Sequence, residues 1–229
     1  AVLQIILTAI LLFSLPLWKG RISADAAADT EKQEPLSLKK IIRIPGAKAV
    51  MVTFFCYCAT EQTTGLWASS YLMLNRGLSE DAAASFASLF FVGITIGRAL
   101  GGFLTLKLND AQMIRLGQVL VAVGALSLLI PFGVSGAMIG LILIGLGCAP
   151  IYPSIIHSTP ERFGADKSQA IIGVQMASAY VGTCLMPPVF GVIANHINVS
   201  LLPIYLLVIL MIMVFMHEKL LKVTSKRHI

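Results

Sequence analysis

Long apolar stretches recur along the chain, and they constrain its fold more than any other feature of the sequence. They lie near residues 1–18, 46–74, 82–106, 111–132, 136–157, 168–194 and 199–216. Each is close to or longer than the ~20 residues that an α-helix needs to cross ~30 Å of hydrocarbon. Strands of a membrane β-barrel would be ~10 residues long with alternating polarity, a pattern that we do not find. The sequence therefore predicts an all-α, polytopic membrane protein with seven spans.

The basic residues are distributed unevenly between the predicted loops. The net charge is +6, which in a soluble protein would suggest a nucleic-acid partner. When the loops are placed alternately on two sides, 16 of the 17 Lys and Arg residues fall on one side and only Arg76 falls on the other. Because positive residues accumulate on the cytoplasmic side, we expect the C-terminus and the basic tail 219–229 to be cytoplasmic. We expect a plasma (inner) membrane protein that does not bind nucleic acid.

The first apolar stretch, residues 1–18, is predicted to be a transmembrane helix. A signal peptide has basic residues before its apolar core, whereas Lys19 and Arg21 follow it here. The chain has no initiator methionine and opens within an apolar helix, so we expect it to be part of a longer transporter.

Residues 19–45 are strongly charged and form the only plausible linker of the chain. Within them, Leu38, Ile41 and Ile42 can share one face of a short helix on the cytoplasmic leaflet, with basic residues on the other face. A solvated charged loop fits the composition equally well.

The third apolar stretch combines a glycine pattern with an embedded arginine. Gly93, Gly97 and Gly101 recur every four residues, which leaves one helix face without side chains and lets a second backbone approach. Arg98 lies beside that face. A guanidinium in hydrocarbon costs several kcal/mol unless it finds a carboxylate, helix-end carbonyls or water. We therefore expect Arg98 to face the bundle interior or the cytoplasmic boundary.

Glu61 is the only acidic residue deep within an apolar stretch, and the predicted topology puts it near mid-bilayer. It shares a helix face with Thr64 and Tyr71. An intramembrane carboxylate indicates a solute or ion pathway, although Glu61 could instead be a structural partner of Arg98. It is also a candidate for proton coupling, because a carboxyl group that is buried without a cation can hold its proton.

Three other side chains are candidates for a solute site, and a fourth is a candidate proton relay. Trp67 could be a pocket wall or an anchor at the outer interface. Tyr152 lies in a helix whose prolines free backbone carbonyls and can open a cavity. The amide of Gln175 suits sugar hydroxyls, but it could equally bond to a neighbouring helix. His157 could relay protons, although an interface histidine is the simpler interpretation.

The sequence offers little support for a metal site, a cofactor or an enzyme. Cys56 and Cys58 point ~200° apart on a helix, so they cannot share a metal, and we interpret the cysteines as small buried hydrophobes. A membrane hydrolase would need a nucleophile paired with a base. Ser154 and His157 are the only nearby pair, and they lack a Gly-x-Ser-x-Gly context. We expect no catalytic residues.

Several of these segments together resemble the major facilitator superfamily, and within it the fucose/proton symporter-like group. The resemblance lies in Glu61 to Trp67 with Tyr71, Gly97-Arg98 with Gly101-Gly102, Ala149 to Ser154, Thr159 to Gly164, and Gly173 to Gln175 with Pro187. It implies a C-terminal six-helix bundle at 46–218 and one preceding helix, the sixth of twelve. Residues 19–45 would then join this bundle to an N-terminal six-helix half that is missing from this chain.

The resemblance also implies a function and roles for individual residues. It implies proton-coupled transport of a small polar solute, most simply a monosaccharide, by alternating access. The residues expected to contact the solute are Glu61, Gln62, Trp67, Tyr71, Tyr152 and Gln175. Those expected to form a cytoplasmic gate are Gly97, Arg98, Gly102, Lys107 and Asp110.

One residue departs from the family pattern of this gate. Thr105 stands where an acidic residue is often found, so Asp110 and Glu161 become the candidate partners of Arg98. The resembled symporters couple protons mainly through carboxylates of the absent half. A drug or metabolite exporter of the same superfamily, or a non-transporting sensor, remains an alternative.

Overall fold

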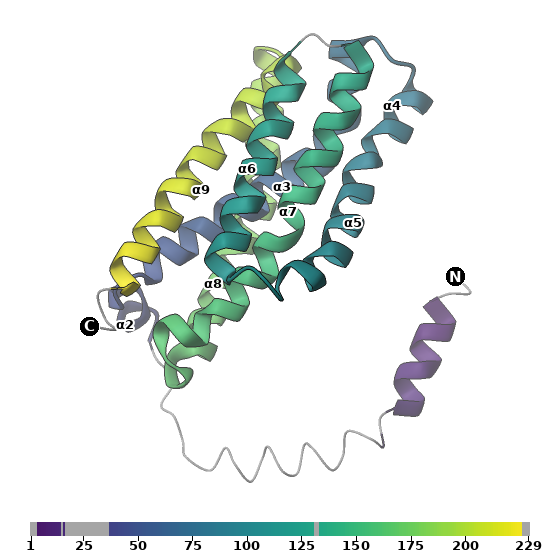
Figure 1. The fold of residues 1–229 in the computed structure, drawn as a ribbon. Coiled ribbons are helices and arrows are strands. Elements are labelled where there is room, and N and C mark those ends of the chain that lie inside the picture. Colours follow the sequence, from purple (N-terminus) through teal and green to yellow (C-terminus); the bar gives the residue numbers. More distant parts are fainter. Residues whose placement is uncertain (1–3, 15, 17–36, 131–132, 226–229) are drawn as a thin grey trace. The chain divides into compact units, whose positions relative to one another are not determined.

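The computed structural model describes residues 4–14, 16, 37–130 and 133–225, and every regular element in these ranges is a helix (Figure 1). The chain divides into two units, residues 1–36 and 37–229. In the first, a short apolar helix spans Gln4–Ser14. Residues 17–36, most of the predicted linker, lie outside the described residues, as does the end of the predicted tail.

The second unit is a bundle of long helices preceded by one short helix. Its elements are α2 (Leu38–Arg43), α3 (Ala47–Arg76), α4 (Glu80–Ala87), α5 (Leu89–Leu104), α6 (Asp110–Leu129), α7 (Gly133–Phe163), α8 (Ala165–His196), the 3₁₀ turn η1 (Val199–Leu201) and α9 (Leu202–Ser225). The short helix predicted around Ile41 is therefore present as α2, and Ile41 is buried. Its position on a lipid leaflet stays a prediction.

Five helices in the described part of the chain are long and apolar enough to cross a membrane. They are α4 with α5, then α6, α7, α8, and η1 with α9. Five of the seven predicted spans meet this measure, and the first, residues 1–18, lies partly outside the described residues. The remaining long helix, α3, has 30 residues and a length of about 45 Å, but its middle carries Glu61, Gln62 and several threonines. Most of these threonines are fully buried, so one face of α3 is covered by its neighbours, while Glu61 and Gln62 are half-buried.

Close backbone contacts hold α7 between α5 and α6 (Figure 1). A Cβ atom on Gly97 would lie 2.6 Å from the Cβ of Ala149, and one on Gly93 would meet the backbone of α7 at Ile142. The expected close approach therefore exists at Gly93 and Gly97. It does not extend to Gly101, where nothing lies within 4 Å of the added atom, because α5 and α7 have separated at that level.

Helix α3 packs against α8 and α9, which follow much later in the chain. The Ser178 hydroxyl donates a hydrogen bond to the Met51 carbonyl at 2.9 Å. The indole N–H of Trp67 donates to the Pro187 carbonyl at 3.1 Å. Gly182 sits against the backbone of α3, where a side chain would not fit. These contacts fix the orientation of α3, and with it the position of Glu61.

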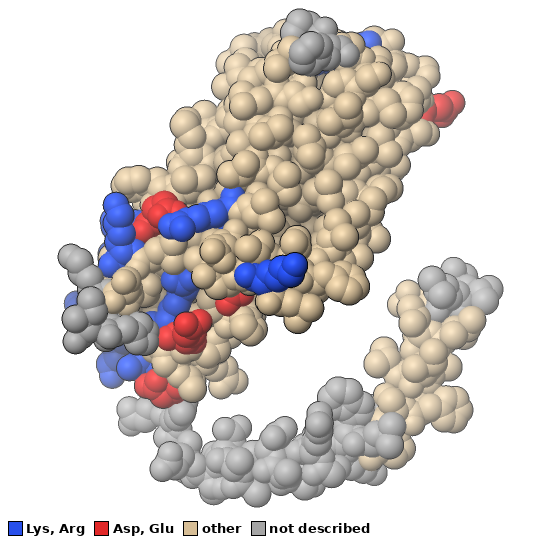
Figure 2. Space-filling view, in the orientation of Figure 1, with Lys and Arg blue, Asp and Glu red and all other residues tan. Residues whose placement is uncertain are grey.

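Charged side chains gather at one end of the bundle, while most of its length is uncharged (Figure 2). This basic end consists of the N-terminal ends of α3, α6 and α8 and the C-terminal ends of α5, α7 and α9. It includes Lys107, Arg115, Arg162 and Lys222. At the opposite end, Arg76 in the last turn of α3 donates to the carbonyls of Leu128 at 2.7 Å and Ile130 at 3.3 Å. The lone cation there caps the carboxyl end of α6.

Candidate functional site

A groove of about 1060 Å³ lies between α5, α7 and the start of α6. It begins at Pro150 and Tyr152 near the middle of α7 and reaches the basic end at Arg162. The ionisable residues that line it are Arg98, Asp110, His157, Glu161 and Arg162. A groove lined by several ionisable side chains within an otherwise apolar bundle is the main candidate for a solute site.

The inner end of the groove is a cluster of aromatic rings beside Glu61. The ring of Tyr152, 38% exposed, lies 5.0 Å from that of Phe54 and 6.2 Å from that of Tyr57 between centroids. The Tyr57 hydroxyl donates a hydrogen bond to the Glu61 carboxylate. These two residues are one helical turn apart on α3, so local geometry brings them together. Glu61 does not itself line the groove, but the ring of Tyr57 connects it to Tyr152.

Arg98 projects into the groove with an exposed side chain. Its charge interacts electrostatically with Glu61, but the two groups do not form a direct ion pair. Arg98 makes neither an ion pair nor a hydrogen bond with any of the described residues. The expectation that Asp110 or Glu161 would hold this arginine is therefore wrong for this conformation.

The register of α5 against α7 explains why Arg98 has no partner. Gly97 contacts Ala149, which precedes His157 by eight residues and Glu161 by twelve. At 1.5 Å per residue, these positions lie about 12 and 18 Å further along α7. An arginine side chain does not span such distances, so Arg98 lies too deep in the bundle for either expected contact.

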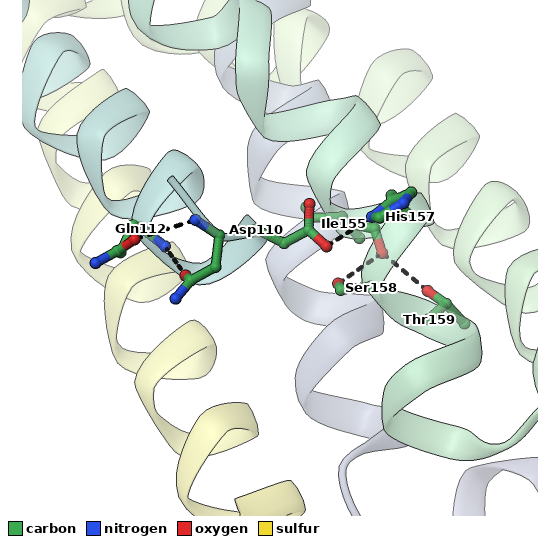
Figure 3. Close-up of polar contacts among 7 residues, drawn as sticks. Asp110, Gln112, Ile155, His157, Ser158 and Thr159 are labelled. Atoms are coloured by element: carbon green, nitrogen blue, oxygen red, sulfur yellow. Dashed lines mark hydrogen bonds and ion pairs between the residues drawn. The ribbon is translucent and has the colours of Figure 1, made fainter. Parts of the chain in front are cut away.

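The Asp110 carboxylate at the start of α6 pairs with a histidine instead of Arg98. The Asp110 carboxylate lies 2.8 Å from Nδ1 of His157 on α7, as Figure 3 shows. A capping box holds this end of α6 in place, because the Asn109 side chain and the Gln112 side chain each accept a hydrogen bond from the other residue's backbone N–H. The His157 side chain is 82% exposed. The pair joins the two helices across the outer part of the groove.

Sequence reasoning underestimated His157, although a signal was present. Pro150, Pro153, His157 and Glu161 all line the groove. Their spacing of three and four residues places them on one helix face. His157 and Glu161 could therefore have been grouped with the two prolines before the structure was known.

The predicted gate residues separate into two sets. Gly97, Arg98, Gly102 and Asp110 line the groove. Lys107 does not, and its exposed side chain lies on the turn between α5 and α6. The Thr105 hydroxyl donates a hydrogen bond to the Gly102 carbonyl at 2.9 Å. It therefore bonds to the backbone at the end of its own helix, α5, and not to a neighbouring helix.

Several residues expected to contact a solute lie elsewhere. Gln175 is fully buried, and its amide donates to the Thr159 hydroxyl at 3.1 Å, which is the interhelical alternative. Tyr71 is buried and donates to the Leu128 carbonyl at 2.7 Å. Neither has a polar atom free for a solute. Gln62 is half-buried on α3 and does not line the groove.

Trp67 also lies apart from the groove. It lines a smaller cavity of about 340 Å³ together with Leu66, Ser70, Pro187 and Pro188. Its ring stands edge-on to Phe190 at 5.2 Å, and its N–H is already bonded to the Pro187 carbonyl. Of the six residues expected to contact a solute, only Tyr152 lines the groove, and Glu61 lies next to it.

The chain is similar to known proteins in sequence and in fold. It is 24% identical over 159 residues to a di-/tripeptide transporter of Lactococcus lactis, covering 68% of this chain and 30% of that protein. It is 23% identical over 180 residues to bypass of stop codon protein 6 of Saccharomyces cerevisiae, covering 72% of this chain and 35% of that protein. The chain thus spans about a third of the length of these relatives.

Solved structures with the same fold include a peptide transporter POT in complex with sulfate, with a TM-score of 0.66, 20% identity and coverage of 81% of this chain and 40% of that one. The fucose:proton symporter of E. coli matches with a TM-score of 0.63, 19% identity and coverage of 78% and 44%. A family model described as Major Facilitator Superfamily matches residues 50–228. The chain therefore belongs to the Major Facilitator Superfamily.

Proposed function

We propose that the full-length protein is a secondary active transporter that moves a small polar solute by proton-coupled alternating access. This chain would supply one six-helix bundle, and a second bundle outside this chain would complete the pathway. The family match and the 40–44% coverage of the solved transporters support this arrangement. The observation that carries the proposal is the groove, in which Arg98 and Tyr152 project from apolar helices with Glu61 directly behind.

The first solutes to test are di- and tripeptides. The curated relatives from Lactococcus lactis are named di-/tripeptide transporters, and a groove of about 1060 Å³ has room for such molecules. Peptides carry both charges, and Arg98 lines the groove while the Glu61 carboxylate lies behind its inner end. The monosaccharide expected from the sequence ranks second, because the fucose symporter is similar in fold at only 19% identity.

The basic end would face the cytoplasm of a cell whose plasma membrane holds the protein, since cations accumulate on that side. In this orientation the Asp110–His157 pair lies at the cytoplasmic exit of the groove. We propose that it acts as the gate contact in place of the expected contact to Arg98. The C-terminus would then be cytoplasmic.

Uptake by the full-length protein in proteoliposomes tests this proposal. We expect an imposed inward proton gradient to stimulate uptake of labelled dialanine, with L-fucose as the second solute. Glu61→Gln should abolish the stimulation, because an amide cannot bind and release a proton. Glu80→Gln, which removes an exposed carboxylate at the start of α4, is the matched control.

Two results would contradict parts of this proposal. Unchanged gradient stimulation and pH dependence in Glu61→Gln would remove Glu61 from proton coupling. Absence of any gradient-driven uptake would reject the importer. Efflux from preloaded vesicles would then identify an exporter, and solute binding without flux would identify a sensor.

A further inference from the structure

This inference rests on the proposed transport function and names its solute class. We propose that Arg98 is a binding site for a carboxylate group of the solute, so that the groove recognises carboxylate-bearing molecules. The guanidinium lies within the groove, is exposed to it, and makes no ion pair with a described residue. Its planar fork of N–H donors matches a carboxylate in two parallel hydrogen bonds.

Two other arginines and a histidine close to the groove each have a polar partner, whereas Lys107 lies outside the groove lining. Arg115 forms two hydrogen bonds with Glu218, at 2.7 and 2.8 Å. Arg162 is half-buried and donates to the Thr224 hydroxyl at 3.4 Å. His157 pairs with Asp110. Among the described groove-lining cations, Arg98 alone retains its full capacity to donate hydrogen bonds.

The depth of Arg98 argues against a purely structural role at the membrane surface. It precedes the end of α5 by six residues, which is about 9 Å along the helix axis. A cation at such a depth is unfavourable unless an anion or water compensates it. The acidic groups of the outer groove lie about 12 Å or more further along α7, as the register of Gly97 against Ala149 shows. An anionic group of the solute can fill this position.

The position of Glu61 predicts how a bound solute would be oriented. Its carboxylate interacts electrostatically with Arg98 across the inner end of the groove, and the Tyr57 hydroxyl anchors it on α3. The two opposite charges do not form a direct ion pair, and only Arg98 lines the groove. A solute with a carboxylate would place it on Arg98, and any cationic group would lie nearer to Glu61.

The test compares binding of solute pairs that differ only at the carboxylate. Calorimetry with the purified full-length protein would measure dialanine against dialanine amide, glucuronate against glucose, and lactate against lactamide. Hydrogen bonds between charged groups account for a roughly ten- to hundredfold difference in affinity. We expect the acid of at least one pair to bind that much more tightly than its neutral analogue.

Variants then assign the preference to Arg98. Arg98→Gln should remove the preference, because the affinity for the acid falls while the affinity for the neutral analogue stays unchanged. Arg98→Lys should retain part of the preference. Lys48→Gln, which removes an exposed cation outside the groove, should retain the full preference. A loss of affinity for both members of a pair in Arg98→Gln would indicate a structural role and overturn the proposal.

The remaining outcomes separate this inference from the proposed function. If a neutral solute such as glucose binds and glucuronate does not, transport stands and the carboxylate subsite is wrong. A preference for the acid that persists in Arg98→Gln also overturns the subsite. If no member of any pair binds to the wild-type protein, both proposals fail for these solutes.

Discussion

Two glycines one turn apart on α5 allow a matched test of the helix packing. A Cβ atom on Gly97 would lie 2.6 Å from the Cβ of Ala149 and 3.0 Å from the Leu146 carbonyl oxygen. Neither neighbour can move alone, because one is backbone and the other is attached to it directly. On Gly101 the same atom would meet nothing within 4 Å. The substitutions Gly97→Ala and Gly101→Ala therefore differ mainly in the contact with α7.

The expected difference follows from this contact. Both substitutions share the gain of up to ~1 kcal/mol that alanine brings to a helix, so this contribution cancels between them. Inserting a methyl group into a packed contact costs ~1–3 kcal/mol. Gly97→Ala should therefore have a free energy of unfolding ~1–3 kcal/mol below that of Gly101→Ala. Reversible unfolding of the full-length protein in SDS-containing mixed micelles measures both values. Equal stability of the two variants would refute the packing of α5 on α7 described above.

Three further experiments test other contacts. Arg76→Gln should lower the free energy of unfolding by roughly 1.5–3 kcal/mol, because the charged donor to the Leu128 carbonyl is lost, and thermal unfolding of this variant beside Arg76→Lys would check it. A double-mutant cycle of Asp110→Asn and His157→Asn should give a coupling energy below ~1 kcal/mol, since the histidine is largely exposed, and a larger coupling would show that the pair is shielded from water. Gln175→Leu should lower stability by ~1 kcal/mol without changing solute affinity, whereas weaker binding would return Gln175 to the site.

The helices could be predicted from the sequence because apolarity and length alone require them. The same reasoning identified Tyr152 and Arg98, since an arginine or a proline-flanked tyrosine in an apolar stretch has few alternatives. It could not separate Tyr152 from Gln175. An amide within a helix forms either an interhelical bond or a solute contact, and only the rotation of α8 against Thr159 decides between them.

Contacts between residues distant in the sequence were also beyond prediction. Asp110 and His157 are 47 positions apart in the sequence, and their contact depends on the axial register of α6 against α7. The absence of a close approach at Gly101 likewise depends on the angle between α5 and α7. A repeat of glycines shows where a backbone could approach, and the tertiary packing determines where one does.

The position of α3 has a consequence for the order in which the bundle assembles during synthesis. Helices α5, α6 and α7 are consecutive and α7 contacts both of the others, so they can associate as soon as α7 has entered the membrane. The partners of α3 on α8 and α9 arrive much later, and the bonds from Ser178 to Met51 and from Trp67 to Pro187 join residues 127 and 120 positions apart. Until α8 emerges, the polar middle of α3 around Glu61 lacks its final cover. The most polar long helix of the bundle is thus made first and enclosed last, and during that interval the nascent chain is most exposed to misassembly and quality control.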